Sequence, residues 1–504
     1  MDKHLESLNS GMKKCIRYFS NKISLQESPI HIYTHIDSDG LSAGAILGKA
    51  LYREKLPFQI TILKQLEREE IEKIADKIED SNVFIIFTDF GSGQYLELLE
   101  SFSKKPSDPG FIILDHHLPQ DISDIEQISS INEIHKKTSP WHMNPYFYGI
   151  DGSTEISGAG MSYFFAKCLN EENIDLSGIA IVGATGDIQN QEKSKNFSGI
   201  NISILQDAVK TRVIDTVHDL SFSSIKPLNE AIAYSNDIRL PGLTNDPNKT
   251  LKFLKASGVL MENLDGTIRT LHDLDQDEKQ KISTSILEYA TVKLGIEPSD
   301  IVDKLIVNKY LLPNECKYLE LHDTREFSYL LNSCGRSNNG SIGIAVAMGD
   351  RKQAYNQALE ILKNYKSLIS SSISWIYENN KIQSKENIYY FFGENHIPES
   401  VIGVVTSIIV FNNLDKTDKS KPIFGVALRE EEEVYKISGR AHESIVEMGV
   451  NLSDAIRKAL DLTGIDALGG GHPPAAGTKV PIAKIDDFLA SIDKIIKEQL
   501  ETSN

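Results

Sequence analysis

Four apolar segments in the first part of the chain each run directly into acidic or histidine side chains. The segments are "PIHIYTHIDSDG", "NVFIIFTDFGSG", "FIILDHHLP" and "GIAIVGATGDIQ". The side chains at their ends are, in order, His35, Asp37 and Asp39; Asp89; Asp115, His116 and His117; and Asp187. A single acid after a strand is usually a turn or helix-cap residue. The same pattern occurs four times, and this recurrence indicates that the four clusters share a functional site.

The residue types at these ends are those of a divalent metal site. Carboxylates that are crowded together repel one another and resist ionisation unless cations lie between them. Carboxylates mixed with imidazoles suit metals such as Mn²⁺, and the lack of a cysteine in the set argues against a structural zinc site. Two such ions, about 3.5–4 Å apart, can bind a phosphoryl group, activate a water and stabilise the leaving oxygen. The sequence therefore predicts a two-metal hydrolytic site.

The sequence between the four polar clusters predicts a fold that brings the clusters together. Helix-like sequences follow the first two segments, "LSAGAILGKALYRE" and "QYLELLESF". Strands that alternate with helices form a parallel sheet with right-handed crossovers, and ligands bind outside the carboxyl ends of its strands. We therefore expect an α/β fold in which all four segments, including the one that ends at Asp187, are strands whose carboxyl ends meet at the metals.

Composition limits the class of protein. A chain of 504 residues is long enough for two or three domains. The net charge of −18 argues against a protein that coats nucleic acid, but allows local binding of phosphate where cations supply the charge. Apolar runs such as "VIGVVTSIIVF" are too short to span a membrane, and the four scattered cysteines fit a reducing compartment. We expect a cytoplasmic protein without membrane association.

The C-terminal part contains a second candidate site, suited to an anion. "VYKISGRAHE" is typical of a strand that carries Ser438 and Arg440, and "DALGGGHPPAAG" places Gly470 and Gly471 before His472. Consecutive glycines let backbone N–H groups approach an anion closely, and an arginine can bind phosphate with two parallel hydrogen bonds. A glycine run alone is more often a flexible turn, so both interpretations stay open on these residues.

These motifs together resemble a known family. "HIDSDG", "TDFGSG", "DHH" and "GATGD" match, in order, the four motifs of the DHH phosphoesterase superfamily, and are most similar to those of archaeal RecJ-like nucleases. "SGR" and "GGGHPPAAG" resemble the DHH-associated C-terminal domain, which binds the nucleic-acid strand. The resemblance implies a parallel-sheet DHH lobe and a smaller α/β C-terminal lobe. The implied domains are a DHH phosphoesterase domain over 1–213, an intervening helical region over 214–320 and a substrate-binding domain over 321–504.

The resemblance also implies a role for each site residue and two Mn²⁺ ions, with Mg²⁺ as the alternative. The implied ligands are His35, Asp37 and Asp89 for one ion, and Asp39, Asp89, His116 and Asp187 for the other. His117 would face the scissile phosphate or its leaving group, and Asp115 would orient the histidines. The implied substrate-binding residues are Arg336 in "LLNSCGRSNNGSIG" and the group Ser438, Arg440, Gly470, Gly471 and His472.

One further segment suggests a phosphate contact from its residues. "STEISGAG" places Ser157 and Gly158 at the start of the helix-like "MSYFFAKCL". The N-terminus of a helix can bind phosphate through its free N–H groups. Small residues at such a position also allow close packing, and that alternative is nearly as strong.

We expect, on this basis, a metal-dependent exonuclease that hydrolyses phosphodiester bonds in single-stranded DNA or RNA, in DNA replication or repair. The resemblance implies the GINS complex of the replicative helicase as a partner. One alternative is a small-molecule phosphoesterase acting on oligonucleotides or nucleoside bisphosphates, although such members of the superfamily are usually shorter. The other is a replisome scaffold without activity, which would be expected to have lost metal ligands that this sequence keeps.

Overall fold

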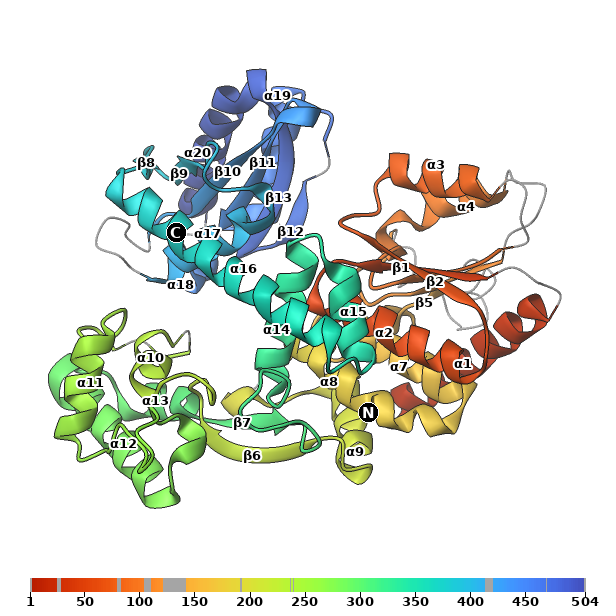
Figure 1. Cartoon of the computed structure of the whole chain (residues 1–504). Coiled ribbons are helices and arrows are strands. Elements are labelled where there is room, and N and C mark those ends of the chain that lie inside the picture. Colours follow the sequence, from red (N-terminus) through yellow and green to blue (C-terminus); the bar gives the residue numbers. More distant parts are fainter. Residues whose placement is uncertain are drawn as a thin grey trace. The chain divides into compact units, whose positions relative to one another are not determined.

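The chain forms two compact units, and Figure 1 shows their elements in sequence colours. Unit 1 is Met1–Leu359 and unit 2 is Glu360–Asn504. The computed structural model describes residues 2–24, 29–78, 83–103, 110–120, 142–190, 193–235, 237–238, 240–412, 420–467 and 469–502, and every structural statement below concerns these residues.

Unit 1 is built on a parallel five-stranded sheet in the order β2-β1-β3-β4-β5. The strands are β1 (Ile30–His35), β2 (Phe58–Leu63), β3 (Phe84–Thr88), β4 (Phe111–Leu114) and β5 (His142–Met143). From β1 the chain adds β2 on one side and β3 on the other, so the order reverses between β1 and β3. In open α/β sheets the crevice at such a reversal is where ligands bind. The fold therefore marks the carboxyl ends of β1 and β3 as the candidate site.

Helices cover both faces of this sheet, which explains why its strands β3 and β4 are buried along their whole length and almost entirely apolar. Ile32 and Ile86 face a core shared with α1, α2 and α7, whereas Tyr33 and Phe87 face a core shared with α3 and α4. Figure 1 shows these two helical layers on either side of the strands. The helices are α1 (Asp2–Ile23), α2 (Ser38–Arg53), α3 (Arg68–Lys77), α4 (Tyr95–Ser103) and α7 (Gly158–Leu169).

The expected strand before Asp187 is a helix, so that prediction is wrong. Ser177–Gly186 forms α8, and Asp187 is its C-terminal cap residue. Small residues let this helix approach its neighbours closely: a Cβ on Gly183 would lie 2.4 Å from the Ala159 Cβ, and one on Gly186 would lie 2.5 Å from the Ser38 Cβ. A short apolar run looks the same in a buried strand and a buried helix. Three of the four polar clusters thus follow strands, and the fourth follows a helix.

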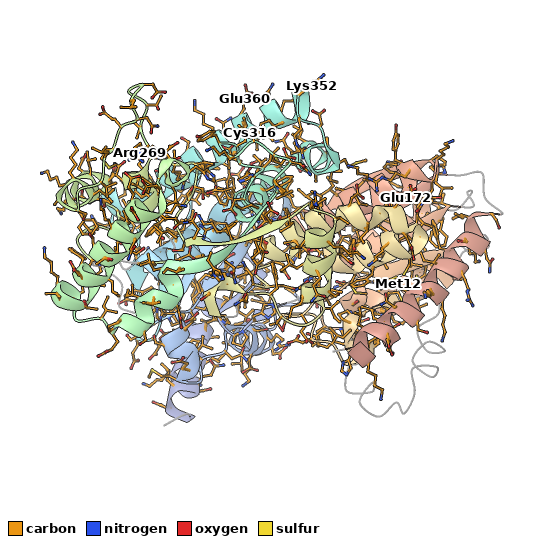
Figure 2. All side chains as sticks on the ribbon, turned by 90° about the horizontal axis from the view of Figure 1, so that it is seen from below. Met12, Glu172, Arg269, Cys316, Lys352 and Glu360 are labelled. Atoms are coloured by element: carbon orange, nitrogen blue, oxygen red, sulfur yellow. The ribbon has the colours of Figure 1, made fainter. Side chains whose placement is uncertain are left out.

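A helical region is inserted into unit 1 through a two-stranded antiparallel ribbon. The ribbon consists of β6 (Asp215–Leu220) and β7 (Ile306–Leu311). Between these strands lie α10 (Leu228–Ala233), α11 (Pro247–Ala256), α12 (Gln276–Glu288) and α13 (Pro298–Leu305), around their own apolar core. Arg269, labelled in Figure 2, is buried there and donates two hydrogen bonds of 2.6 Å to the Glu278 carboxylate.

Two further helices complete unit 1. They are α14 (Thr324–Arg336) and α15 (Gly340–Met348), and both pack against α2, while α14 also packs against α8. The division between the units therefore falls near residue 360, within α16 (Gln353–Glu378). The predicted domain boundary at 320/321 lies inside unit 1, because α14 and α15 pack on α2, and α14 also packs on α8.

Unit 2 has a six-stranded mixed sheet in the order β12-β13-β11-β10-β9-β8. Its strands are β8 (Gln383–Ser384), β9 (Tyr389–Phe392), β10 (Ile423–Arg429), β11 (Val434–Arg440), β12 (Gly470–His472) and β13 (Ala475–Pro481). Phe424 and Val426 face a core shared with α19 (Leu452–Thr463) and α20 (Ile485–Thr502). Gly425 faces the opposite side, against α17 (Glu399–Asn412). Among the described helices, none is both long and apolar enough to cross a membrane.

Candidate metal centre

The turn from β1 into α2 supplies the first three side chains. Asp37 caps α2 by accepting the Gly40 N–H at 3.0 Å, and its other oxygen lies 3.0 Å from His35 Nδ1. Asp39, in the first turn of the helix, accepts the N–H groups of Gly158 and Ala159 at 2.6 and 3.0 Å. These donors belong to the N-terminus of α7, whose positive end favours a carboxylate. Two helix N-terminal ends therefore hold the two aspartates in fixed positions.

Asp89 lies directly after β3 and between the other ligands. Its carboxylate is 1% exposed, with one oxygen 3.5 Å from His35 Nδ1 and the other 3.2 Å from His116 Nε2. Its backbone is left-handed (φ +63°), a conformation that aspartate and asparagine adopt more readily than most residues. Neither carboxylate oxygen has a hydrogen-bond partner among the described residues. Each oxygen is thus directed at a different histidine.

His116 is oriented by a backbone carbonyl. Its Nδ1 lies 2.7 Å from the Gly152 carbonyl oxygen and donates a proton to it, which leaves Nε2 as the inward-facing atom. Nε2 is 3.2, 3.6 and 3.8 Å from carboxylate oxygens of Asp89, Asp39 and Asp187. A histidine that donates its second nitrogen to a carbonyl has the arrangement of a metal ligand. Glycine is required at 152, since a Cβ there would lie 1.9 Å from the His116 carbonyl oxygen.

Asp115 and His117 form a second arrangement at the same edge. The fully buried Asp115 accepts hydrogen bonds from the N–H groups of Ser92, His116 and His117 and from His117 Nδ1, at 2.8, 2.8, 3.1 and 2.9 Å. Burial opposes ionisation of Asp115, but His117 and these hydrogen bonds hold its pKa below the usual value. The His117 side chain is 52% exposed. A fixed carboxylate therefore orients an imidazole that solvent and substrate can reach.

The electrostatics of the cluster favour added positive charge. Burial and the charges of Asp89, Asp187 and Asp37 raise the pKa of Asp39 well above its usual value. Burial, Asp89 and Asp37 likewise raise the pKa of Asp187 to about 6. Burial alone would lower the pKa of His116, but the surrounding carboxylates hold it well above the usual value. Crowded carboxylates of this kind are relieved by bound cations.

All six predicted metal ligands lie in this cluster. Their ligand atoms form two groups, each within 4.8 Å: His35, Asp37 and Asp89, and Asp39, His116 and Asp187. A third group joins Asp89 and His116 to His117. Four buried atoms of the cluster have no hydrogen-bond partner among the described residues: His35 Nδ1, both Asp89 oxygens and His116 Nε2. Buried polar atoms are rarely left unpaired, so this donor set fits divalent metal ions.

Ser157, Gly158 and Arg336 also lie beside the cluster, but the first two have other contacts. Ser157 is buried and caps α7 through the Gly160 N–H at 3.2 Å, and the Gly158 N–H is bound to Asp39. The geometry thus gives these two residues a packing and positioning role, and their contact with substrate stays a prediction. Burial opposes ionisation of Asp37, but His35 and, less strongly, the charge of Arg336 at the end of α14 lower its pKa.

The predicted anion-binding residues of unit 2 lie together on its sheet. Opposite residues on antiparallel neighbours point to the same face, and here Arg440 pairs with Ala475, which pairs with His472. Ser438 pairs with Gly477, which pairs with Gly470, in the next such row. The Arg440 guanidinium donates to Ser407 Oγ at 2.8 Å and to the Gly439 carbonyl oxygen at 2.7 Å. Gly471 has φ +139°, and a Cβ there would lie 2.3 Å from the Ala475 carbonyl oxygen.

Several residues that shape the metal cluster carry no signal in the sequence. Gly152 and Gln189 act through hydrogen bonds to His116 and Asp187, and the Asn332 side chain accepts the Ser38 N–H at 2.9 Å. Gly183 leaves space for Asp39, since a Cβ there would lie 2.6 Å from its carboxylate. Gly183 and Gly186 belong to the "GATGD" motif, but their packing role appears only in the folded chain.

Comparison with known proteins supports the same family. A family model described as the DHH-CID domain matches residues 223–306, and one described as the DHHA1 domain matches residues 397–498. An uncharacterized protein of Methanocaldococcus jannaschii is 31% identical over 491 residues, which cover 97% of this chain and 98% of that protein. Its similarity therefore extends over both units.

Solved structures share the fold at low sequence identity. RecJ from Thermus thermophilus, in complex with Mn²⁺, has a TM-score of 0.56 and 15% identity over 97% of this chain. This chain spans about half of that RecJ (55%). A second exonuclease RecJ bound to manganese has a TM-score of 0.54 and 16% identity, covering 97% of this chain and 94% of that one. CDC45 from Entamoeba histolytica has a TM-score of 0.60 and 11% identity, covering 98% of both chains.

The fold and the site thus define a RecJ-like α/β architecture with a candidate divalent-metal centre. The chain belongs to the DHH superfamily. The M. jannaschii protein is a relative that matches this chain over nearly its whole length.

Proposed function

We propose that this protein is a two-metal exonuclease that hydrolyses phosphodiester bonds in single-stranded nucleic acid. The observation that carries the proposal is the gathering of six carboxylate and imidazole ligands at the β1/β3 edge of the sheet. A phosphoesterase is the class of enzyme that the family and this donor set support. Manganese is the proposed metal because the donor set mixes oxygen and nitrogen, with magnesium as the alternative.

The residues of the candidate site would have different roles in hydrolysis. Two bound ions would neutralise charge at the scissile phosphate and lower the pKa of an attacking water. Asp89 would hold both ions, since its two oxygens face different histidines. Asp115 fixes the ring of His117, whose other nitrogen can then donate a proton to the leaving oxygen. Asp39 is held by two N–H groups of α7, so it would be positioned before an ion binds.

Unit 2 would bind the strand. Its exposed Gly470 has no atom within 4 Å of the position of an added Cβ, so the backbone there is open to a phosphate. Arg440 and His472 lie in one row, two strands apart, which is about 10 Å at the usual strand spacing. Side chains that are this far apart could contact different phosphates of one strand.

The rival proposals make different demands on these residues. A scaffold needs no metal ligands, yet all six are present and clustered. A small-molecule phosphoesterase needs the metal ligands and contacts to one short substrate, whereas a strand can also use phosphate contacts well beyond the scissile bond. Association with the GINS complex, and a role in replication or repair, stay predictions that rest on the resemblance of the motifs alone.

Strand length tests the proposal directly. We expect hydrolysis in Mn²⁺ to become more efficient as single strands lengthen from two nucleotides and to level off by about ten to twenty, because each added phosphate contact releases counterions. Blunt duplex should be a poor substrate. The measurement is kcat/KM for end-labelled DNA and RNA strands at fixed salt. Dinucleotides cleaved as efficiently as long strands would favour the small-molecule enzyme, and cleavage of no substrate would favour the scaffold.

Removing the arginine of unit 2 should weaken strand binding without affecting the metals. For Arg440→Gln we expect a loss of one phosphate contact, so that the slope of log affinity against log salt becomes shallower by about 0.7 for a single strand. The matched control is Arg429→Gln, on the neighbouring strand β10, whose guanidinium is already paired with Glu432 at 2.8 Å. Fluorescence anisotropy with a labelled strand measures both. Equal slopes for parent and Arg440→Gln would show that this arginine does not bind phosphate.

A further inference from the structure

Gln189 occupies the interior position behind the metal cluster, two residues after Asp187. The residue is only 1% exposed, and three oxygens surround its amide nitrogen. Nε2 lies 2.9 Å from Asp187 Oδ2, 3.0 Å from the Gly152 carbonyl oxygen and 3.1 Å from the Ile156 carbonyl oxygen. The amide oxygen accepts a hydrogen bond from Asn201 Nδ2 at 2.7 Å. These partners fix the direction of the amide.

Two of these contacts lead to ligands of the same group. The Asp187 carboxylate is itself a candidate ligand, and the Gly152 carbonyl is the group that orients His116 through Nδ1 at 2.7 Å. One amide therefore connects two of the three side chains in the Asp39–His116–Asp187 group. Its described hydrogen bonds do not extend to His35 or Asp37, which belong to the other group.

The backbone next to Gln189 is strained in the conformation that places its side chain in the interior. Ile188, between Asp187 and Gln189, has φ +58°, a left-handed conformation that a β-branched residue rarely adopts. Its side chain is 59% exposed, so burial of an apolar group does not explain the strain. The turn lets Asp187 leave α8 toward the cluster while Gln189 returns to the interior, where its N–H donates to the Ala184 carbonyl oxygen at 2.9 Å.

We propose that Gln189 is a positioning residue that fixes Asp187 and His116 for one of the two metal ions. This inference rests on the proposed function, since it assumes that the cluster binds metal. A carboxylate and an imidazole that are held in place before the ion arrives lose less freedom on binding. The consequence is selective: loss of the Gln189 amide weakens one ion and leaves the His35–Asp37–Asp89 ion nearly unchanged.

The test is a metal titration without substrate. Full-length Gln189→Leu keeps a similar volume and removes every hydrogen bond of the side chain. Mn²⁺ binding is measured by calorimetry and by the electron paramagnetic resonance signal of free Mn²⁺. We expect the parent to bind two ions, and the variant to bind one of them about 10–100-fold more weakly, the usual effect of removing a partner of a metal ligand. A residue with only a structural role would change the unfolding temperature in chelator but neither affinity.

Two further variants complete the experiment. Gln499→Leu removes a half-buried amide of unit 2 that bonds Asn451 and Asp454, and should leave both Mn²⁺ affinities unchanged. Asn201→Ala removes only the donor to the Gln189 oxygen, and should weaken the same single ion by a smaller factor. This second variant carries the test if Gln189→Leu does not fold.

The outcomes separate the inference from the proposed function. If the parent binds no Mn²⁺, the two-metal function fails, and the role of Gln189 fails with it. If the parent binds two ions and neither Gln189→Leu nor Asn201→Ala weakens one of them, the positioning role is overturned while the proposed function stands. Equal weakening of both ions would also overturn it, because the inference requires selectivity.

Discussion

Replacing Asp89 by asparagine is expected to lower hydrolysis by more than about 10³-fold while the protein stays folded. The two oxygens of Asp89 face His116 and His35, so that one carboxylate serves both candidate ions. Asparagine keeps the size of the side chain and accepts the left-handed backbone at this position, but it offers one acceptor oxygen and no charge. The measurements are kcat/KM on a single strand and Mn²⁺ stoichiometry.

The control for this prediction is an aspartate outside the metal cluster. Asp265 lies in an exposed turn of the intervening region, where it accepts the Thr267 N–H at 3.0 Å, and Asp265→Asn should hydrolyse like the parent. In chelator, Asp89→Asn should unfold at a temperature no lower than the parent, since the substitution removes one of several crowded negative charges. Activity of Asp89→Asn near that of the parent would exclude a bridging carboxylate.

The location of the candidate metal site could be predicted from the sequence because the carboxyl ends of neighbouring parallel strands lie at one edge of the sheet. Once β1, β3 and β4 are recognised as neighbouring parallel strands, Asp89 and Asp115 must lie at the same edge as His35. No contact needs to be known for that conclusion. Which of the side chains at this edge are candidate metal ligands then follows from residue type alone, since carboxylates and imidazoles bind divalent metals.

The strand assigned before Asp187 shows where such reasoning stops. "GIAIVGATGD" is apolar and small up to its final aspartate, which suits a strand buried on both faces and equally a helix buried among other helices. The close packing of Gly183 against Ala159 favours the helix, and that contact exists only in the folded chain. Asp187 nevertheless lies in the cluster, as predicted, because the end of α8 meets the same edge.

The supporting contacts of the site could not be predicted. The orientation of His116 depends on the carbonyl of Gly152, and every residue has a carbonyl, so no side-chain type announces it. In the same way the small residues Ser157 and Gly158 left phosphate binding and close packing open, and only the structure shows that Asp39 accepts the Gly158 N–H while Ser157 caps α7. A helix N-terminus binds an anion, and here the nearest anion is the protein's own carboxylate.

His117 should be needed for the chemical step and not for metal binding. Its ring is held by Asp115 at 2.9 Å and is half exposed, as a proton donor to substrate must be. Its position within 4.8 Å of Asp89 and His116 ligand atoms would also allow it to bind an ion, so the two roles must be distinguished. We expect His117→Ala to lower kcat by about 10²–10⁴-fold, the usual range for a general acid, and to leave Mn²⁺ affinity unchanged. His218→Ala, an exposed histidine on β6, is the matched control.

The leaving group of the substrate separates the roles most sharply. In a natural strand the leaving group is a sugar alkoxide, which must be protonated. In a nitrophenyl ester of a nucleotide the leaving group is nitrophenolate, which is stable without a proton. If His117 donates the proton, His117→Ala should recover most of the parent rate on the nitrophenyl ester while staying slow on the natural strand. A metal ligand would be needed for both substrates, because the ions act on the phosphate itself. Equal loss on the two substrates, together with weaker Mn²⁺ binding, would therefore make His117 a ligand and leave the proton to be supplied by water.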